Sequence, residues 1–290
     1  MKLKPASTFG RARPHAPNSQ APMMRIAGVQ MASGPNVAAN LNEAKRLIGM
    51  AVEKGARLVA LPEYFGIMGM KDSDKVKVRE AEGKGPIQQF LSETARQHRI
   101  WLVGGSVPLV SDDANKVRNA SLVYDDQGKL VARYDKIHLF GFEMGKEQYF
   151  EERTIEPGRD IRVIDSPFGR IGLSICYDLR FPELYRAMQE VDLILVPSAF
   201  TETTGKAHWE TLIRARAIEN LAYVLAPAQG GYHVNGRETH GDSMIVDPWG
   251  AVLDRLPRGS GVVVAGINPE YARRLRKSLP ALAHRKIHRC

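Results

Sequence analysis

Three side chains that can cooperate in nucleophilic catalysis each follow an apolar run of strand length: Glu63, Lys136 and Cys176. A thiol becomes a good nucleophile when a charge or a base helps to form the thiolate. A carboxylate can accept that proton and later return it to a departing amine. A fixed ammonium can stabilise the oxyanion of a tetrahedral intermediate. The three residue types are therefore complementary for attack on an acyl group and release of an amine.

Each of these residues also has a purely structural explanation when it is taken alone. A glutamate after a strand often belongs to the first turn of a helix, a lysine is usually a surface charge, and a cysteine is often a small buried hydrophobe. Their shared position favours catalysis, because ligands of layered α/β proteins bind beyond the carboxyl ends of strands. Cys176 also precedes a predicted helix, so nearby backbone N–H groups should point at the bond that it attacks. The N–H of Tyr177 is the natural second oxyanion donor beside Lys136.

The elements that must position these residues follow from hydrophobic periodicity and from turn residues. Turn sequences at 125–128 and 166–169 each separate two apolar runs, which predicts hairpins. Predicted strands cover 25–31, 57–61, 101–106, 120–124, 130–134, 162–165, 171–175, 193–197, 223–228, 243–246 and 262–267, and predicted helices cover 36–54, 87–98, 182–190 and 208–220. Strands that alternate with helices and hairpins predict a layered α/β domain with a mixed sheet.

The net charge of +9 at pH 7 is carried by the two ends of the chain. Residues 1–25 contain five Lys or Arg and no acid, and residues 271–290 contain seven and no acid, which leaves −3 for the residues between them. We expect a disordered basic extension at 1–24, one domain at 25–268, and a basic C-terminal tail at 269–290. The tail has enough apolar residues to dock at a subunit interface. A basic tail can bind RNA, an anionic membrane or an acidic partner, but solvated ends are the simpler interpretation.

Composition excludes several classes of protein. Hydrophobic residues make up 43% and charged residues 25%, which is ordinary for a globular domain, and no apolar run approaches the ~20 residues of a membrane span. The two cysteines, Cys176 and Cys290, cannot form a disulfide framework, so we expect a reducing, cytoplasmic location. The N-terminal extension lacks the apolar core of a secretory signal. Its acid-free, Arg- and Ser-containing sequence weakly fits an organelle transit peptide, which we consider the less favoured interpretation.

The sequence lacks the motifs of three other kinds of site. Ser243 lacks the Gly-x-Ser-x-Gly turn of many serine hydrolases. The histidines show neither a His-Glu-x-x-His pattern nor a Cys/His cluster, so we expect no metal site. A Gly-x-x-x-x-Gly-Lys phosphate loop is also absent from the sequence.

Three blocks around the candidate residues resemble the motifs of the nitrilase, or carbon–nitrogen hydrolase, superfamily. They are LVALPE at 58–63, YDKIHLF at 134–140 and ICYDLRFPEL at 175–184, and their order Glu, Lys, Cys also matches. Flanking blocks match as well: GVQ at 28–30, HW at 208–209, RARAIEN at 214–220 and GDSMIVDPWG at 241–250. The resemblance extends over roughly residues 25–270.

The resemblance implies a four-layer α-β-β-α sandwich that is often dimerised or further assembled. It implies that Glu63, Lys136 and Cys176 are the catalytic residues, and that the site needs no metal and no organic cofactor.

Family members often carry a second active-site glutamate ahead of a Pro-Gly turn. Glu151 lies at the matching distance before the Pro157-Gly158 pair. Glu147 and Glu152 are close enough in sequence to remain alternatives for this role.

The block ICYDLRFPEL is most similar to the Nit branch of the superfamily. That branch includes amidases of deaminated glutathione and ω-amidases of α-keto acid amides, and Pro182 favours the first type. Both substrates are anionic, so the resemblance implies a cation in the pocket. Arg180 is the candidate, although a structural ion pair with Asp178 or Glu183 is an equally good explanation of this residue.

The expected activity is hydrolysis of a small anionic carboxamide to an acid and ammonia through a cysteine thioester. Activity as an ω-amidase, an N-carbamoyl amine hydrolase or a nitrilase remains an alternative. The expected partners are a small-molecule amide and further copies of the chain, with neither nucleic acid nor membrane. A non-catalytic scaffold that binds RNA or anionic membrane through its basic tails is the alternative of a different class, and the complete Glu–Lys–Cys set argues against it.

Overall fold

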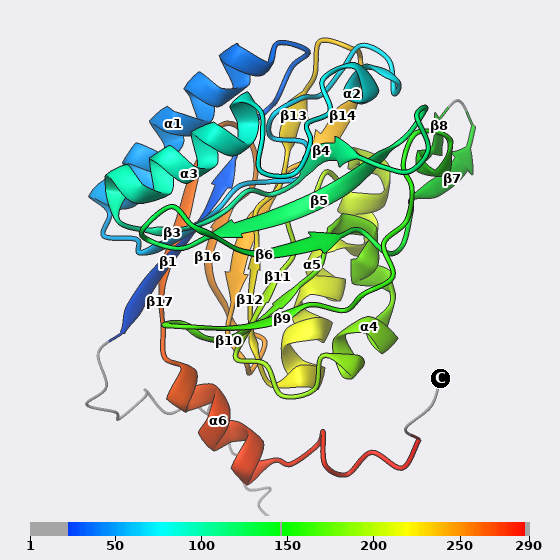
Figure 1. Ribbon diagram of the computed structural model, residues 1–290. Coiled ribbons are helices and arrows are strands. Elements are labelled where there is room, and N and C mark those ends of the chain that lie inside the picture. Colours follow the sequence, from blue (N-terminus) through cyan, green and yellow to red (C-terminus); the bar gives the residue numbers. More distant parts are fainter. Residues whose placement is uncertain (1–22, 146, 288–290) are drawn as a thin grey trace, which may run out of the picture.

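Two β-sheets lie face to face at the centre of the computed structural model, which describes residues 23–145 and 147–287 (Figure 1). The first sheet contains, in spatial order, β17 (Gly261–Ile267), β1 (Met24–Gln30), β2 (Leu58–Ala60), β3 (Trp101–Val103), β5 (Val117–Tyr124) and β4 (Val107–Val110), with β6 (Leu130–Asp135) paired to β5. Strands β1, β2 and β3 run parallel, and the other pairs are antiparallel. The sheet is therefore mixed, as the sequence predicted.

The second sheet repeats this plan with three parallel strands at its centre. Its spatial order is β16 (Val252–Leu256), β15 (Ser243–Val246), β12 (Tyr223–Ala226), β11 (Leu193–Leu195), β10 (Gly169–Leu173) and β9 (Val163–Ser166). Strands β10, β11 and β12 are the parallel ones. Two small hairpins stand apart, β7 (Gly141–Met144) with β8 (Glu147–Phe150) and β13 (Gly230–Tyr232) with β14 (Glu238–His240).

Helices cover the outer face of each sheet. On the first sheet these are α1 (Val37–Glu53) and α3 (Pro86–His98), and on the second sheet they are α4 (Pro182–Ala187) and α5 (Glu202–Asn220) (Figure 1). Shorter helical segments are α2 (Asp74–Lys77), η1 (Glu151–Arg153) and η2 (Cys176–Arg180), and α6 (Pro269–Ser278) follows the last strand. The expected four-layer α-β-β-α sandwich is confirmed.

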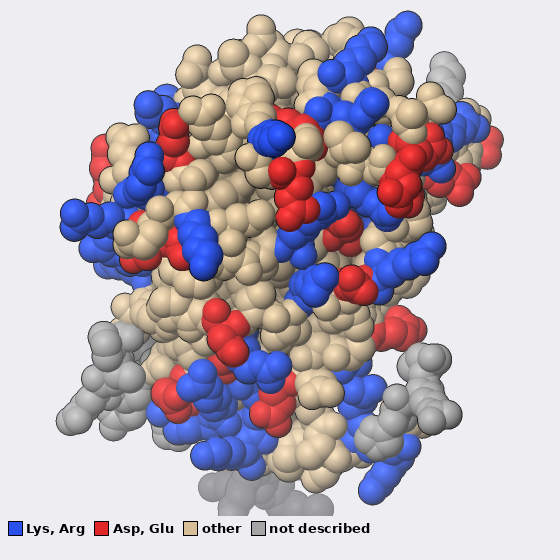
Figure 2. Space-filling view, in the orientation of Figure 1, with Lys and Arg blue, Asp and Glu red and all other residues tan. Residues whose placement is uncertain are grey.

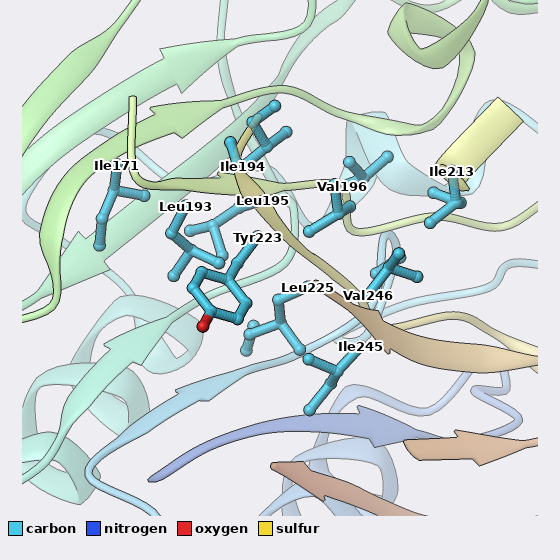
Figure 3. Packing of buried hydrophobic residues seen from close by; sticks show 14 of the residues in the cluster. Ile171, Leu193, Ile194, Leu195, Val196, Ile213, Tyr223, Leu225, Ile245 and Val246 are labelled. Carbon is cyan, nitrogen blue, oxygen red and sulfur yellow. The ribbon is translucent and has the colours of Figure 1, made fainter. Parts of the chain in front are cut away.

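Alternation along the strands explains the layers. In β1, Ile26 belongs to the core between the two sheets, whereas Ala27 packs with α1 and α3. In β2, Leu58 faces the inner core and Val59 faces the helices. Because both faces are buried, these strands read as continuous apolar runs rather than as alternating ones. Figure 3 shows buried side chains of the second sheet from close by, together with Ile213 of α5; side chains of neighbouring strands lie against one another.

Several element boundaries differ from the predicted ones; helix α4, for example, ends at Ala187 rather than at 190. Helix α5 begins at Glu202 rather than at 208, because the Thr201 side chain caps it by accepting a hydrogen bond from the N–H of Thr204 at 3.2 Å. The polar first turns of α5 gave no apolar period to detect. Strand β3 stops at Val103 because Gly105 turns the chain at φ +47°, where a Cβ would lie 2.0 Å from the Pro62 carbonyl oxygen. Strands β4, β7, β8, β13, β14 and β16 were not predicted.

The basic stretch 269–290 begins with an ordered helix. Asn268 caps α6, and Ala272 and Arg276 of this helix are buried. Arg276 forms an ion pair with the buried carboxylate of Asp192 at 2.6 Å. Figure 2 shows that Lys and Arg gather with some acids around the lower end of the molecule, where α6 lies in Figure 1. Almost all of the predicted extension at 1–24, namely residues 1–22, falls outside the described residues, as does Cys290.

Candidate active site

The fold brings Glu63, Lys136 and Cys176 together from three separate parts of the chain. Glu63 follows β2, Lys136 follows β6, and Cys176 opens η2 after β10. The Lys136 Nζ lies 2.8 Å from Glu63 Oε1, and the side chains of both residues are at most 1% exposed. Glu63 and Cys176 also line the same small pocket, and burial and the charge of Glu63 raise the pKa of the thiol. One carboxylate therefore lies beside the nucleophile and contacts the ammonium.

Cys176 sits on a sharp turn. Its φ of +48° lies in the left-handed region, which a side chain other than glycine adopts only when the surroundings impose it. The Cys176 N–H donates to the Pro197 carbonyl, and the Ala199 N–H approaches Sγ at 3.5 Å. Among the described residues the N–H of Tyr177 has no acceptor, so it is available to a ligand oxygen.

A buried carboxylate, Asp178, fastens the turn that carries the nucleophile. One oxygen accepts from the Ile175 N–H at 2.9 Å and from the Tyr134 hydroxyl at 2.7 Å. The other accepts from the His138 N–H at 3.0 Å and lies 2.7 Å from the Nδ1 of the same histidine. Asp178 thus ties the residue before the nucleophile to the strand that leads to Lys136. No sequence motif indicated this role, and Asp178 was expected only as a partner for Arg180.

Of the three candidates for a second glutamate, the structure places Glu151 at the site. Its carboxylate oxygens lie 2.9 and 2.7 Å from the Lys136 Nζ. It also accepts from the Tyr64 hydroxyl at 2.6 Å and from the Phe140 N–H at 2.7 Å. Glu152 is exposed, and Glu147 instead accepts a hydrogen bond from Thr203. The Lys136 ammonium is therefore held between two carboxylates.

Burial and the neighbouring charges set the protonation states of the site. Burial raises the pKa of Glu63, although the Lys136 charge opposes this shift. Burial and the Glu63 charge raise the pKa of the Cys176 thiol well above its ordinary value. Burial alone would raise the pKa of Glu151, but the charge and hydrogen bonds of Lys136 hold it below the ordinary value. The two carboxylates conversely raise the pKa of Lys136 against the effect of burial. The resting site therefore contains a thiol, a neighbouring base and a permanently charged lysine.

Arg180 lines the same small pocket as Cys176, Glu63 and Glu151. Its guanidinium lies 5.3 Å from the centroid of the Phe200 ring and 5.8 Å from that of Tyr177. Its Nη1 lies 3.3 Å from the Nδ1 of His208. Within the described part of the chain it makes no ion pair, because the Asp178 oxygens are occupied and Glu183 is exposed and does not pair with it. The structural ion pair considered for Arg180 is thus not formed.

Three further polar groups, none of them indicated by a sequence motif, hold Glu63 and the residue after it in place. Asn119 donates to Glu63 Oε1 at 3.0 Å, and the Gln229 amide donates to the Glu63 backbone carbonyl at 2.9 Å. The Ser106 hydroxyl accepts from the N–H of Tyr64 at 2.9 Å. A buried amide such as Asn119 within a strand is the one signal that could have indicated this role.

Two other kinds of site are absent from residues 23–145 and 147–287. In those ranges no group of three or more His, Cys, Asp and Glu side chains could hold a metal ion. No helix formed by the same residues is long and apolar enough to cross a membrane.

Known proteins resemble this chain over most of its length. A protein from Synechocystis sp., named deaminated glutathione amidase, is 42% identical over 265 residues, which are 89% of this chain and 97% of the relative. The crystal structure of the C. elegans NitFhit protein superposes with a TM-score of 0.83 at 40% identity, over 91% of this chain and 65% of the NitFhit chain. The present chain thus spans about two thirds of that longer protein.

A third relative connects the fold with cysteine chemistry. A mutant of the amidase from Nesterenkonia sp. AN1 is 29% identical and has a TM-score of 0.73, over 89% of this chain and 98% of the amidase. Its structure contains the product of Michael addition of acrylamide at the active-site cysteine.

The family expected from the three sequence blocks is also recovered by a family model. The model for carbon–nitrogen hydrolases matches residues 25–277, which include Glu63, Lys136, Glu151 and Cys176. The expected resemblance is therefore confirmed over nearly all of the described residues. This chain belongs to the carbon–nitrogen hydrolase family.

Proposed function

We propose that this protein is a thiol-dependent amidase in which Cys176 is the nucleophile. The observation that carries the proposal is the position of Glu63, whose carboxyl group lines the pocket at Cys176 and contacts the Lys136 ammonium. A base beside the nucleophile and a cation that stays charged are what amide cleavage through an acyl-enzyme requires.

The first half of the reaction forms a thioester. Glu63 accepts the thiol proton while Sγ attacks the carboxamide carbon, and the carbonyl oxygen becomes an oxyanion. The Lys136 ammonium and the free N–H of Tyr177 hold this oxyanion. Glu63 then gives its proton to the nitrogen as the C–N bond breaks, and ammonia or an amine leaves.

The second half restores the enzyme. Glu63 removes a proton from a water molecule that attacks the thioester carbon, and the same two donors hold the second oxyanion. The C–S bond breaks, the acid leaves, and Glu63 returns the proton to the sulfur. Glu151 acts through Lys136, because its carboxylate keeps the ammonium charged and fixed between two partners.

The substrate of this proposal is a small anionic carboxamide similar to deaminated glutathione. Curated relatives of that name, one of them 42% identical, support this choice. Arg180 supports it as well, because it presents a guanidinium to the Cys176 pocket and the described residues offer it no carboxylate. Its fork of donors is suited to a substrate carboxylate.

Assembly and location complete the proposal. We propose a homo-oligomer in the cytoplasm that has no nucleic-acid or membrane partner, with 1–24 as a basic extension to a domain at 25–268. The small number of cysteines supports a reducing location. The family resemblance supports association of like chains.

The experiment is a substrate panel read by release of ammonia or amine, with the wild-type protein and Cys176→Ala. The panel contains a carboxamide, the matching nitrile, an N-carbamoyl amine and the carboxamide with hydroxylamine as acyl acceptor. We expect the carboxamide to be hydrolysed fastest, and Cys176→Ala to lose this activity while its melting temperature stays near that of the wild type.

Mass spectrometry of the trapped enzyme supplies an independent readout. A covalent acyl adduct should be found on Cys176 of the wild-type protein and not on the alanine variant. Faster turnover of the nitrile, or more than a few per cent of amidase activity in Cys176→Ala, would overturn the proposal.

A further inference from the structure

A second cavity adjoins the pocket at Cys176, and Arg237 lines both of them. The pocket at Cys176 has a volume of about 10 Å³, which is roughly the room for one water molecule. The adjoining chamber has a volume of about 420 Å³ and falls in the ordinary range of ligand sites. A substrate too large for the pocket at Cys176 would extend past Arg237 into the chamber.

Arg237 is a half-buried guanidinium without a carboxylate partner among the described residues. Its Nη2 donates to the Ala199 carbonyl at 3.2 Å, and its planar group lies 4.8 Å from the centroid of the Tyr149 ring. Its Nε is buried and donates to no atom of the described chain. An aromatic face compensates only part of the cost of burying a cation. Arg237 thus has donors left for an anion.

Lys75 is a second cation that lines the chamber and has no carboxylate partner among the described residues. Its Nζ donates to the Thr154 hydroxyl at 3.2 Å and lies 5.3 Å from the centroid of the Tyr64 ring. Burial lowers the pKa of Lys75, and the charge of Asp72 opposes this effect. An incoming anion would restore the preference of Lys75 for its charged form.

The chamber also contains acids, and their positions leave the two cations available. Asp72 is exposed at the rim beside the exposed Lys71. Glu147 accepts a hydrogen bond from Thr203 at 2.6 Å through one oxygen, and its other oxygen is buried with no partner in the described ranges. Among the described residues, Arg237 donates to the Ala199 carbonyl and Lys75 to the Thr154 hydroxyl, and neither cation is paired with these acids. A ligand with a carboxylate for the cations and an N–H or O–H donor for Glu147 would satisfy both kinds of group.

We propose that Arg237 and Lys75 bind a carboxylate that the substrate carries away from its scissile amide. The preferred substrate then has two negative groups, one at Arg180 and one in the chamber. This inference rests on the proposed amidase function. It adds that the preferred substrate carries a second carboxylate and that Arg237 and Lys75 bind it.

The kinetic test compares amides that differ by one carboxylate. Succinyl-glycine is compared with succinyl-propylamine, which varies the amine side, and the monoamide of tricarballylate is compared with succinamate, which varies the acyl side. We expect kcat/KM to be about tenfold to 100-fold higher for the dianionic member of at least one pair, since a charge-assisted hydrogen bond has a strength of that order. The pair that shows the preference identifies the side of the amide that lies in the chamber.

Three variants then assign the preference to residues. Arg237→Gln and Lys75→Met should each bring the ratio of kcat/KM within that pair close to 1. Lys75→Met is needed because Arg237 also holds the Ala199 carbonyl beside the nucleophile, whereas the Lys75 contacts are with Thr154 and Tyr64. The matched control is Arg96→Gln, which removes an exposed cation on α3 and should leave the ratio unchanged. Equal kcat/KM within both pairs, or a preference that persists in both chamber variants, would overturn the inference.

A binding measurement separates this inference from the proposed function. Calorimetry with Cys176→Ala uses glutarate and butyrate as probes, which differ by one carboxylate. Glutarate should bind at least tenfold more tightly than butyrate, and adding Arg237→Gln should abolish the difference. If wild-type protein hydrolyses no amide but glutarate is bound in this way, the amidase proposal fails and the anion site stands. Equal binding of both probes refutes the anion site whatever the turnover.

Discussion

Replacing Asp178 by Asn should disturb the turn that carries Cys176 without changing the size of the side chain. In the structure the fully buried carboxylate accepts from the Ile175 N–H and the Tyr134 hydroxyl on one oxygen. It accepts from the His138 N–H on the other. Burial and the Asp178 charge raise the pKa of Tyr134, so its hydroxyl remains a donor at every accessible pH.

The magnitude follows from the number of acceptors. An asparagine offers one acceptor oxygen, and its NH₂ group must then face either the Ile175 N–H or the His138 N–H. A buried N–H without an acceptor costs about 1–3 kcal/mol. Each 1 kcal/mol lowers the melting temperature of a chain of this size by about 2–4 °C. Because the Ile175 N–H adjoins the nucleophile, we also expect kcat to fall about tenfold to 100-fold, as small misplacements of reacting groups do.

Thermal melts and steady-state kinetics on an anionic amide test this reasoning, with Tyr134→Phe as the matched variant. That change removes one donor but leaves the carboxylate and both N–H groups paired, so it should cost only about 1 kcal/mol and lower kcat much less. KM should change little in either variant, since Asp178 positions the nucleophile and touches no substrate. If Asp178→Asn and Tyr134→Phe show the same melting temperature and the same kcat, the carboxylate does not position the turn and the argument is refuted.

Three other outcomes follow from the structure. Lys136→Gln should lower kcat about 100- to 1,000-fold with a smaller change in KM, since it removes one oxyanion donor; a rise in KM at constant kcat would instead make Lys136 a binding residue. The acid limb of the pH profile of kcat/KM should lie above pH ~4.3, the ordinary pKa of a glutamate. The reason is that burial raises the pKa of Glu63 and only its unprotonated form can act as the base. An acid limb at or below the ordinary glutamate pKa would contradict this prediction. Arg276→Ala should destabilise the fold by about 3 kcal/mol in thermal melts, since it leaves the buried Asp192 with one fewer cation. The control Arg274→Ala, at an exposed position, should change stability by less than about 0.5 kcal/mol. Equal melting temperatures of the two variants would indicate that the docking of α6 does not depend on the Arg276–Asp192 pair.

The central strands could be predicted from the sequence because each is a short apolar run that both sheet faces bury. Local composition was sufficient for β1 and β2, whose buried residues alternate between two cores, and for β11, whose three residues are all buried in one core. The hairpins β7–β8 and β13–β14 escaped prediction because they are short and largely polar, and pairing rather than burial defines them. The stretch after residue 268 looked like a tail because its charges dominate its composition. Only the position of Asp192, far away in sequence, shows why Arg276 is buried.

In the site, the reacting groups could be predicted from the sequence, whereas the groups that position them could not. Glu63, Lys136 and Cys176 could be selected because each follows a recognisable strand, and parallel strand ends converge in space. Spacing alone left three glutamates for the second position. The backbone decides between them, because the N–H of Glu151 donates to the Phe140 carbonyl while its side chain accepts from the Phe140 N–H. This double contact folds Glu151 back onto the segment that follows Lys136, so the second glutamate reaches the lysine through a contact between the two ends of a hairpin. Such a contact depends on chain geometry and leaves no periodic pattern in the sequence.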